Sequence, residues 1–334
     1  MPNLEISDLV MKETINIEKD LFISYGTAAS EAMFDFPCNF FRIPECSGVV
    51  AYRIESQCAV VFGEPLCPSH EKNQLLKAFH EYCQKVNLND IYVIISQELA
   101  NALMASHCSI MIESSKELII DPDFDPIKHS NRFRHRVEKA IKHGLTVHEY
   151  IPFDQEIETA LKEIGIKWQA AIKGPHIYLG HLNFFENYAG KRWFYVKDKD
   201  EITSMVMLSR LDGQNGWLLK FLITAPTAVH DTSEFLMTSI LDVLRKENCR
   251  FLSKGMIPAD ILGEVKGLGS FKESCARVTF KFISWMYRFH KRKEYWLRYN
   301  PQLLPTYLVF GRSSIGINEM KALMKIFRTS HSMQ

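Results

Sequence analysis

The sequence predicts an α+β fold made of two similar units, and three observations support this. First, a series of helices, an antiparallel meander, a helix and a strand occurs twice along the chain. Second, 334 residues are enough for two ordinary domains. Third, 46% of the residues are hydrophobic and 24% are charged, as in globular proteins. We expect one unit over 1–150 and another over 151–334, packed together because no glycine- or serine-rich linker separates them.

The first unit begins with a mixed helical pattern over residues 1–30. The stretch "SGVVAYRIESQCAVVFGEPLC" predicts two strands around a turn near Glu55-Ser56. A helix over 71–86 then places Leu75, Leu76, Phe79 and Cys83 on one side. The elements expected next are a buried strand at 90–96, a short helix at 96–107, a strand at 117–122, a basic helix within 130–144 and a strand at 145–151.

The second unit repeats this order. A helix is predicted over 154–172, followed by three strands within 192–224 that are separated by Lys-Asp and Gly-Gln-Asn-Gly turns. The helix over 231–247 has Asp231 as its expected N-cap and Glu234 three residues later, which is a capping-box arrangement. A strand over 249–255 completes the repeat.

The strand "WLLKFLIT" is predicted to lie in the middle of the second sheet. Because side chains alternate along a strand, its two faces are expected to hold Trp217, Leu219, Phe221 and Ile223 on one side and Leu218, Lys220, Leu222 and Thr224 on the other. Both faces are largely apolar, so the strand is expected to be buried on both sides. A lysine there is costly to bury unless it is paired or opens into a cavity.

The basic segment "SNRFRHRVEKAIKHG" has the period of an amphipathic helix with an apolar stripe. Its stripe consists of Phe133, Val137, Ala140 and Ile141, flanked by Arg132, Arg136, Lys139 and His143 on one side and Arg134, His135, Glu138 and Lys142 on the other. Gly144 is suited to end the helix, whereas either Asp125-Pro126 or Ser130 could begin it. One acid among seven basic groups favours an anionic partner, and the alternative is an ordinary solvated face.

Bulk properties exclude several classes of protein. A net charge of +1 predicts no whole-protein attraction for nucleic acid or anionic lipid, so any such attraction must be local. No apolar run approaches the roughly 18–20 residues of a membrane span, and the N-terminus lacks a secretion pattern, which predicts a soluble, cytoplasmic protein. The eight cysteines form no CxxC pair and the twelve histidines no HExxH spacing, so we expect reduced thiols and no metal.

Five stretches resemble, in matching order, the soluble C-terminal synthase domain of bacterial phosphatidylglycerol lysyltransferases, the multiple peptide resistance proteins. The first, "FFRIPECSGVVAYRIESQCAVVFGEPLCP", is similar to the opening hairpin of that family and its Gly-Asp-Pro turn, here Gly63-Glu64-Pro65. The others are "ELIIDPDFDP" with "FRHRVEKAIKHGLTV", "LLKFLITAPTAVHD", "LSKGMIP" and "YWLRYNPQLLPTYLVF", and together the match covers about residues 35–312.

The resemblance implies a fold, a chemistry and a set of site residues. It implies two tandem GNAT-like domains, each a mixed, mostly antiparallel sheet flanked by helices. Family members move an aminoacyl group from charged tRNA to a hydroxyl of a lipid head group, so the site must position both partners, remove a proton and stabilise an oxyanion. The residues at matching positions that are candidates for catalysis are Lys220, Asp231 and Glu117, and His230 joins them because an imidazole just before the helix could serve as a general base. The candidates for substrate binding are Arg132, Arg134, Arg136, Lys139, Trp217 and Arg298.

The sequence departs from the family pattern in two motifs. The Asp-x-x-Arg of the family falls on Trp217-Leu218-Leu219-Lys220, and a lysine cannot form the bidentate fork of an arginine. The later Lys-x-Lys falls on Trp296-Leu297-Arg298, which keeps one cation of two. Asp231 could instead be a structural cap, Glu117 could be structural, and His230 is either a general base or a surface loop histidine. The turn "APTAVHDTSEF" lacks the glycines that hold the pyrophosphate of acetyl-CoA, so this cofactor is not favoured.

Two further segments combine aromatic or apolar residues with cations. Residues 280–299, "FKFISWMYRFHKRKEYWLRY", suit either a core helix with a solvated rim or a surface that contacts a bilayer or RNA bases. The C-terminal "INEMKALMKIFRTSHSMQ" suits a docking helix or a frayed end.

The leading hypothesis is an acyl- or aminoacyl-transferase that needs no cofactor besides its donor, charged tRNA or acyl-CoA. It would work in the cytoplasm at the inner face of the membrane, with tRNA and an anionic lipid surface as partners. The alternatives are a binding module in which catalysis has decayed, as the Trp217 position suggests, and an N-acyltransferase that uses CoA or an acyl carrier on a small amine. The sequence does not define the oligomeric state.

Overall fold

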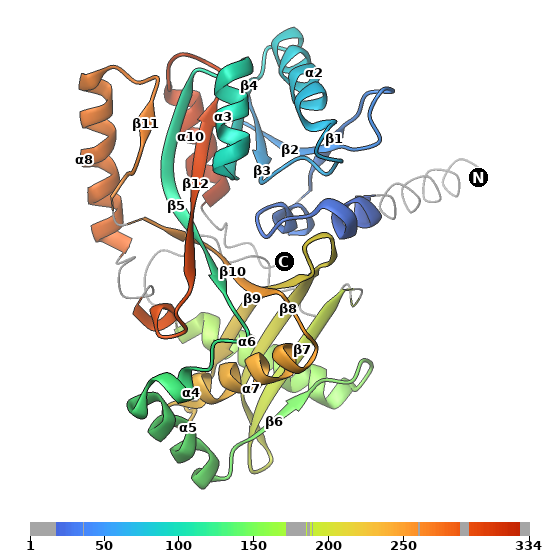
Figure 1. Ribbon diagram of the computed structural model, residues 1–334, viewed down its shortest axis with the longest axis vertical. Helices are drawn as coiled ribbons and strands as arrows, with labels where there is room; N and C mark the ends of the chain where they lie inside the picture. Colours follow the sequence, from blue (N-terminus) through green and yellow to red (C-terminus); the bar gives the residue numbers. More distant parts are fainter. Residues whose placement is uncertain are drawn as a thin grey trace, which may run out of the picture.

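The computed structural model describes residues 18–35, 37–171, 185, 188, 190–259, 261–287 and 294–327, without the side chains of 282–287. In these ranges the strands form one twelve-stranded sheet in the order β1-β2-β3-β4-β12-β5-β10-β9-β8-β7-β6, with β11 paired to β5 (Figure 1). Most neighbours in this sheet are antiparallel, while β3–β4 and β9–β10 are parallel. The predicted α+β class with two GNAT-like halves is confirmed.

The first part of the chain forms one side of the sheet. After a helical turn over 18–25, its elements are the 3-10 helix η1 (Ser30–Phe34), β1 (Asn39–Phe41), β2 (Val50–Glu55), β3 (Cys58–Phe62), α2 (Lys72–Lys85), β4 (Asn89–Ile95), α3 (Gln97–Ser106) and β5 (Ile110–Ile120). The predicted turn between the first two long strands is confirmed, since Ser56 and Gln57 have positive φ angles of 49° and 62°. Strand β5 starts earlier than predicted because its polar residues pair with β10, β11 and β12 on both sides.

The rest of the chain forms the other side of the sheet and then returns to the first side. Its elements are α4 (Pro126–His129), α5 (Asn131–His143), β6 (Thr146–Glu149), α6 (Gln155–Ala171), β7 (Lys191–Asp198), β8 (Glu201–Leu211), the 3-10 turn η2 (Asp212–Gln214), β9 (Gly216–Thr224), α7 (Thr232–Lys246), β10 (Phe251–Pro258), β11 (Val265–Lys266), α8 (Ser270–Tyr287), β12 (Gln302–Phe310) and α10 (Ile317–Phe327). None of the helices in the described ranges combines the length and the hydropathy that crossing a bilayer requires.

The two halves of the sheet are interlaced by an exchange of strands. Strand β12 lies between β4 and β5, antiparallel to both, and β5 pairs with β10 of the second half (Figure 1). Each half thus has the same local arrangement, a parallel strand pair with an antiparallel strand from the other half added beside it. Residues 126–149, which a boundary at 150 assigns to the first unit, pack on the second half through α5 and β6. The boundary itself stays a prediction.

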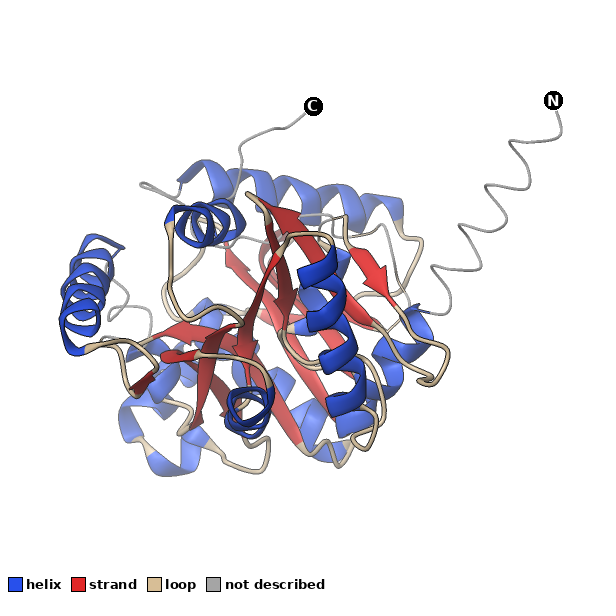
Figure 2. Ribbon diagram, turned by 90° about the horizontal axis from the view of Figure 1, so that it is seen from above, coloured by secondary structure: helices blue, strands red, loops and turns tan. Residues whose placement is uncertain are grey.

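Helices cover both faces of the sheet (Figure 2). In the second half, α5 and α7 cover one face and α6 covers the other. Strand β7 shows the alternation that this requires, since Phe194 and Val196 face α7 whereas Trp193 and Tyr195 face α6. Helix α7 buries five apolar side chains, each contributing about 1.5–3 kcal/mol, namely Leu236, Met237, Ile240, Leu241 and Leu244. This packing holds α7 in place on the sheet, and the candidate site lies at the N-terminal end of this helix.

Strand β9 is central, as predicted, but the predicted alternation of its side chains is wrong beyond Leu219. Its register with β8 shifts, so that Met207 pairs with Phe221 whereas Leu208 pairs with Leu219, which leaves Lys220 as the extra residue of a β-bulge. The bulge moves Phe221 onto the α6 face, while Leu219 stays on the α7 face. Pairing of β9 with β10 runs only from Gly216 to Leu218, so the bulge lies where these two strands stop pairing.

The termini of the basic helix follow the predicted signals. Both candidate starts are used, because the Asp125 side chain caps the short helix α4 and the Ser130 hydroxyl caps α5 by accepting from the Phe133 amide at 3.2 Å. Gly144 ends α5 in the left-handed conformation with φ 92°, which confirms its predicted role. All eight cysteines are free thiols, in agreement with the prediction.

The two amphipathic segments near the C-terminus contribute to the core where the structure describes them. Trp296 and Tyr299 are buried beside α5 and α7, and Ala322 and Ile326 of α10 dock against the first half. The docking-helix interpretation is therefore confirmed over 317–327, and a core role is confirmed for the end of the 280–299 segment. Residues 288–293 and 328–334 lie outside the described residues.

Candidate functional site

A buried carboxylate at the N-terminus of α7 brings together two arginines from distant segments. Glu234 Oε1 accepts hydrogen bonds from Nη1 of Arg136 on α5 and from Nη1 of Arg298, each at 2.7 Å. Its other oxygen, Oε2, accepts from the Ser233 hydroxyl at 2.8 Å. The Glu234 side chain is only 6% exposed, so these contacts are charge-assisted and largely shielded from water. Asp231 lies 3.6 Å from Nε of the same Arg136, so two guanidinium groups face two carboxylates in this cluster.

Arg136 reaches this carboxylate because α5 docks on α7 through its apolar stripe. Phe133, Val137 and Ala140 are buried against α7, as the sequence predicts, and this orients the flank that carries Arg136 toward Glu234. Ile141, which the sequence assigns to the same stripe, is 57% exposed. The buried stripe therefore consists of three residues, and Ile141 is not part of it.

His230 and Asp231 form a histidine–carboxylate pair directly before α7. Asp231 Oδ1 accepts from His230 Nδ1 at 2.9 Å and lies 3.6 Å from Nε of Arg136. The carboxylate is 8% exposed and the imidazole 80% exposed, so the pair joins a buried anchor to a ring at the surface. With the Nδ1 proton donated to Asp231, Nε2 is free to accept a proton from a bound molecule. This is the orientation that a general base requires.

The predicted capping box at Asp231 and Glu234 is wrong. Asp231 occupies the N-cap position of α7, but its side chain makes no capping hydrogen bond, because φ is 74° and the carboxylate turns toward His230 and Arg136. Glu234 bonds the two arginines instead of closing the box. A non-glycine residue at such a φ is uncommon and clusters at functional sites, where packing holds the strained backbone.

Lys220 lies elsewhere, in a buried ion cluster with the N-terminal segment. Its Nζ donates to Glu31 Oε1 at 2.9 Å and to Asp35 Oδ1 at 2.6 Å. The Lys220 side chain is 9% exposed and those of its partners less, so the ammonium is nearly enclosed. A buried lysine at this position was expected to need a partner, and Glu31 and Asp35 provide it. The sequence did not predict that the segment with η1 would contact β9.

The ammonium of Lys220 remains charged in this cluster. Burial alone would lower the pKa of Lys220, but the charges of Glu31 and Asp35 outweigh burial and raise it. Burial raises the pKa of Glu31, against the effect of Lys220 and with the help of Asp35. The two carboxylates thus account for the raised pKa of Lys220, and burial accounts for the raised pKa of Glu31. The role of Lys220 toward a donor stays a prediction.

Glu117 lies on β5 beside the second parallel strand pair. Its Oε1 accepts from the Ser253 hydroxyl of β10 at 2.6 Å. Burial raises the pKa of Glu117, since the Ser253 hydrogen bond compensates only in part and the nearby charge of Glu64 adds to the effect. A carboxyl with a raised pKa is suited either to proton transfer or to donating a hydrogen bond.

We expect Glu117 to make the protein less stable as the pH rises. The folded state holds the Glu117 proton more tightly than the unfolded state, whose pKa is near 4.5. Unfolding therefore releases a proton between 4.5 and the raised pKa, and the free energy of unfolding falls as the pH rises through that window. Urea unfolding at a series of pH values should show a flatter profile for Glu117→Gln than for the unmodified chain.

The control for this measurement is Glu163→Gln, which changes a carboxylate that is 60% exposed on α6. It should leave the pH profile of the urea midpoint unchanged. Identical profiles for Glu117→Gln and the unmodified chain would show that the Glu117 pKa is not raised.

The remaining cations of α5 face outward. Arg134 Nη2 donates to the Ile127 carbonyl at 3.4 Å, which is a weak contact at the protein surface. Arg132 and Lys139 are exposed, and no ion pair holds either of them within the described part of the chain. These side chains lie on the same helix as Arg136, so an anion bound along α5 would approach the Glu234 cluster.

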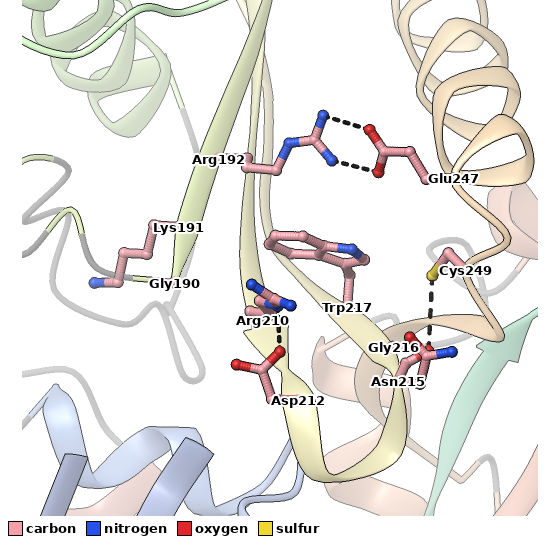
Figure 3. Close-up of a pocket in the computed structure, with 10 residues that line it drawn as sticks. All are labelled: Gly190, Lys191, Arg192, Arg210, Asp212, Asn215, Gly216, Trp217, Glu247 and Cys249. Carbon is pink, nitrogen blue, oxygen red and sulfur yellow. Dashed lines mark hydrogen bonds and ion pairs between the residues drawn. The ribbon is translucent and has the colours of Figure 1, made fainter. Parts of the chain in front are cut away.

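Trp217 lines a separate cavity of about 460 Å³ at the other end of α7. In Figure 3 its indole lies between Arg192 and Arg210, with the Arg192 guanidinium 5.4 Å from the ring centroid. Arg192 is fixed by Glu247 on one side, at 2.7 and 3.0 Å, and by Glu149 on the other. Helix α7 is about 20 Å long, so this cavity is remote from His230.

Four of the ten residues predicted for the site therefore come together, namely Arg136, His230, Asp231 and Arg298. Glu117, Lys220 and Trp217 lie in three other environments, and the other three cations lie on the surface of α5. Glu234, which bonds the two arginines of this group, was assigned to a capping box by the sequence. Its central position could not be predicted because it depends on Arg298, a residue distant in the sequence.

Comparisons with known proteins agree with this structure. The family model for the C-terminal part of phosphatidylglycerol lysyltransferase matches residues 24–310. The phosphatidylglycerol lysyltransferase of Staphylococcus aureus is 21% identical over 310 residues, which are 91% of this chain and 36% of that protein. The Staphylococcus xylosus enzyme of the same name is 22% identical over 92% of this chain and 36% of its own length. The chain thus spans about a third of the length of the curated relatives it matches.

Solved structures show the same fold. The C-terminal domain of a putative lysylphosphatidylglycerol synthetase from Agrobacterium fabrum aligns with a TM-score of 0.78 at 15% identity, covering 96% of this chain and 99% of that one. L-PGS from Bacillus licheniformis aligns with a TM-score of 0.75 at 17% identity over 93% and 96% of the two chains. Since the family model covers most of the sequence, the chain belongs to the family of phosphatidylglycerol lysyltransferase C-terminal domains.

Proposed function

We propose that this chain transfers an aminoacyl group from charged tRNA to a hydroxyl of a lipid head group. Membership of the family supports a transfer to lipid. The observation that carries the proposal is the His230–Asp231 pair beside the Arg136–Glu234–Arg298 cluster, because it joins an oriented base to two guanidinium groups. The activity would take place at the inner surface of the membrane, where both the lipid and the donor are available.

The proposed reaction is the attack of the head-group hydroxyl on the ester carbonyl of the donor. His230 Nε2 takes the hydroxyl proton while the new carbon–oxygen bond forms. The tetrahedral intermediate carries a negative charge, which N–H groups of Arg136 and Arg298 stabilise by hydrogen bonding. Its collapse breaks the bond to the tRNA ribose, and His230 returns the proton to the ribose oxygen that leaves. Asp231 holds the imidazole in one orientation throughout.

A second candidate function is a tandem GNAT-like binding module that has lost transfer activity. It is favoured by one observation, that Trp217 and Lys220 stand where the family resemblance implies Asp and Arg, and both are engaged in contacts within the chain. An N-acyltransferase that uses CoA or an acyl carrier on a small amine remains the other alternative.

Lipid profiling separates these functions. The chain is expressed in a bacterium whose membrane lacks aminoacylated lipids, and the lipids are analysed by mass spectrometry. The proposal expects a new lipid that is heavier by one aminoacyl group and carries a free amine. A binding module leaves both lipids and metabolites unchanged, whereas an acylated small amine with unchanged lipids would indicate the N-acyltransferase.

We expect the outer cations of α5 to contribute to binding of the anionic substrates. Arg132→Ala/Lys139→Ala should weaken binding to tRNA or to anionic vesicles. It should also flatten the salt dependence, by about one unit of slope for each phosphate that the chain no longer neutralises. The measurement is fluorescence anisotropy or vesicle co-sedimentation over a series of salt concentrations.

The matched control is Lys77→Ala/Lys85→Ala, which removes two exposed cations from α2 in the other half of the sheet. This change should leave the affinity and the salt dependence unaltered. An equally weakened affinity in both double variants would mean that the affinity follows net charge alone. An unchanged affinity in both would assign the α5 cations to an ordinary solvated face.

A further inference from the structure

Three metal-ligating side chains meet in the first half of the sheet, outside the proposed transfer site. They are His80 of α2, Asp90 of β4 and His107, which follows the last residue of α3. One ligand atom of each lies within 4.8 Å of the ligand atoms of the other two. The three residues come from separate elements, so the sequence offered no metal-binding spacing that would reveal them.

Asp90 is the buried centre of this group. Its side chain is 4% exposed, and Oδ2 lies 3.0 Å from Nδ1 of His80. A β-carbon at Gly311 would come within 2.1 Å of Asp90 Oδ1, so the glycine leaves the space that this carboxylate occupies. A buried carboxylate is costly unless a positive charge or a metal ion compensates for it.

The hydrogen bonds of the two imidazoles leave ring nitrogens for a ligand. Nδ1 of His107 contacts the Ser106 hydroxyl at 2.9 Å, and its Nε2 is buried without a hydrogen-bond partner in the structure. Nε2 of His80 contacts the Gln84 amide at 2.9 Å, which leaves Nδ1 facing Asp90. When one ring nitrogen is held by an outer partner, the other is oriented as a ligand, as in known metal sites.

We propose that His80, Asp90 and His107 bind a divalent transition metal ion, with zinc as the first candidate. Zinc binds imidazole nitrogen and carboxylate oxygen at about 2.0–2.2 Å, so tetrahedral ligand atoms lie about 3.3–3.5 Å apart. Three atoms already within 4.8 Å of one another reach this spacing through small side-chain rotations. Two histidines and one carboxylate leave a fourth position for water or another ligand.

A metal-free ion pair between His80 and Asp90 is the competing explanation. It satisfies the carboxylate, because a doubly protonated His80 donates to Oδ2. It leaves Nε2 of His107 buried and unsatisfied, at a cost that native structures usually avoid. A metal ion satisfies all three side chains at once, which is why we favour it.

Zinc titration of the chain over residues 1–334 tests the proposal. The protein is dialysed against a chelator and then titrated with Zn²⁺ by calorimetry, alone and as the variants His107→Phe and Asp90→Asn. We expect one saturable site, and an affinity more than about 100-fold weaker in either variant, because even outer-shell partners contribute about 10–100-fold. His135→Phe is the control, since that imidazole is 84% exposed on α5, and it should bind as the unmodified chain does.

A second readout does not depend on the variants. Co²⁺ bound by the unmodified chain should give the strong visible absorption of a tetrahedral nitrogen–oxygen site, and Zn²⁺ in excess should abolish it. The proposal is overturned by the absence of a saturable site, by equal affinity in His107→Phe and the unmodified chain, or by a weak octahedral cobalt spectrum. Circular dichroism of each variant ensures that weaker binding does not reflect unfolding, and neither readout depends on transfer activity.

Discussion

Replacing His230 with glutamine is expected to lower the rate of aminoacyl transfer by about 10²–10⁴-fold, the usual contribution of a general base. Glutamine keeps a polar side chain of similar size but cannot take up the hydroxyl proton. The imidazole is 80% exposed, so folding should be unaffected. The measurement is the initial rate of transfer, with the melting temperature recorded for the same preparation.

Two further variants make this test specific. Asp231→Asn keeps the shape of the side chain but weakens its hold on Nδ1 of His230, so it should lower the maximal rate more than it raises KM. His70→Gln alters an imidazole that is 82% exposed in the other half of the sheet and should have no effect. A His230→Gln variant with full activity would remove the general base from the proposed mechanism.

Replacing Lys220 with methionine is expected to destabilise the protein strongly. The change removes the only ammonium that contacts both Glu31 and Asp35 in the described residues and leaves two carboxylates buried without it. Breaking a buried ion pair in this way costs about 3–5 kcal/mol, because the remaining charge is not compensated. Chemical unfolding at neutral pH should show this as a lower midpoint.

The triple variant Lys220→Met/Glu31→Gln/Asp35→Asn provides the control for that mechanism. It removes all the charges of the cluster together, so it should be considerably more stable than Lys220→Met alone. The alternative role of Lys220, stabilising charge on the donor, predicts the opposite pattern. An unchanged unfolding midpoint together with abolished transfer would assign Lys220 to the substrate rather than to the fold.

The helices and most strands could be predicted because their signals are local. The apolar stripe of α5, its cap at Ser130 and its end at Gly144 depend on neighbouring residues, and the structure agrees with all three. The insertion of β12 between β4 and β5 could not be predicted, because it depends on contacts between residues about 200 positions apart, such as Ser115 and Thr306. Pattern and spacing carry no information about such pairings.

The candidate site was predicted only in part, for the same reason. The resemblance to the family indicated Asp231, whereas His230 was proposed from its place before the helix and from the chemistry of an imidazole. A rule of strict alternation cannot predict the bulge at Lys220, which carries this side chain to Glu31 of η1 and to Asp35 directly after it. The capping box failed because the backbone of Asp231 is left-handed, a conformation that the sequence pattern does not specify.

The most direct test of the proposed function is reconstitution from purified parts. The chain is mixed with tRNA charged with a radiolabelled amino acid and with vesicles that contain phosphatidylglycerol, and the label in the organic extract is measured over time. We expect label to enter the lipid with the unmodified chain, and to do so at most about a hundredth as fast with His230→Gln. Label that stays with tRNA for each of the amino acids tried, with a folded chain and intact vesicles, would contradict it.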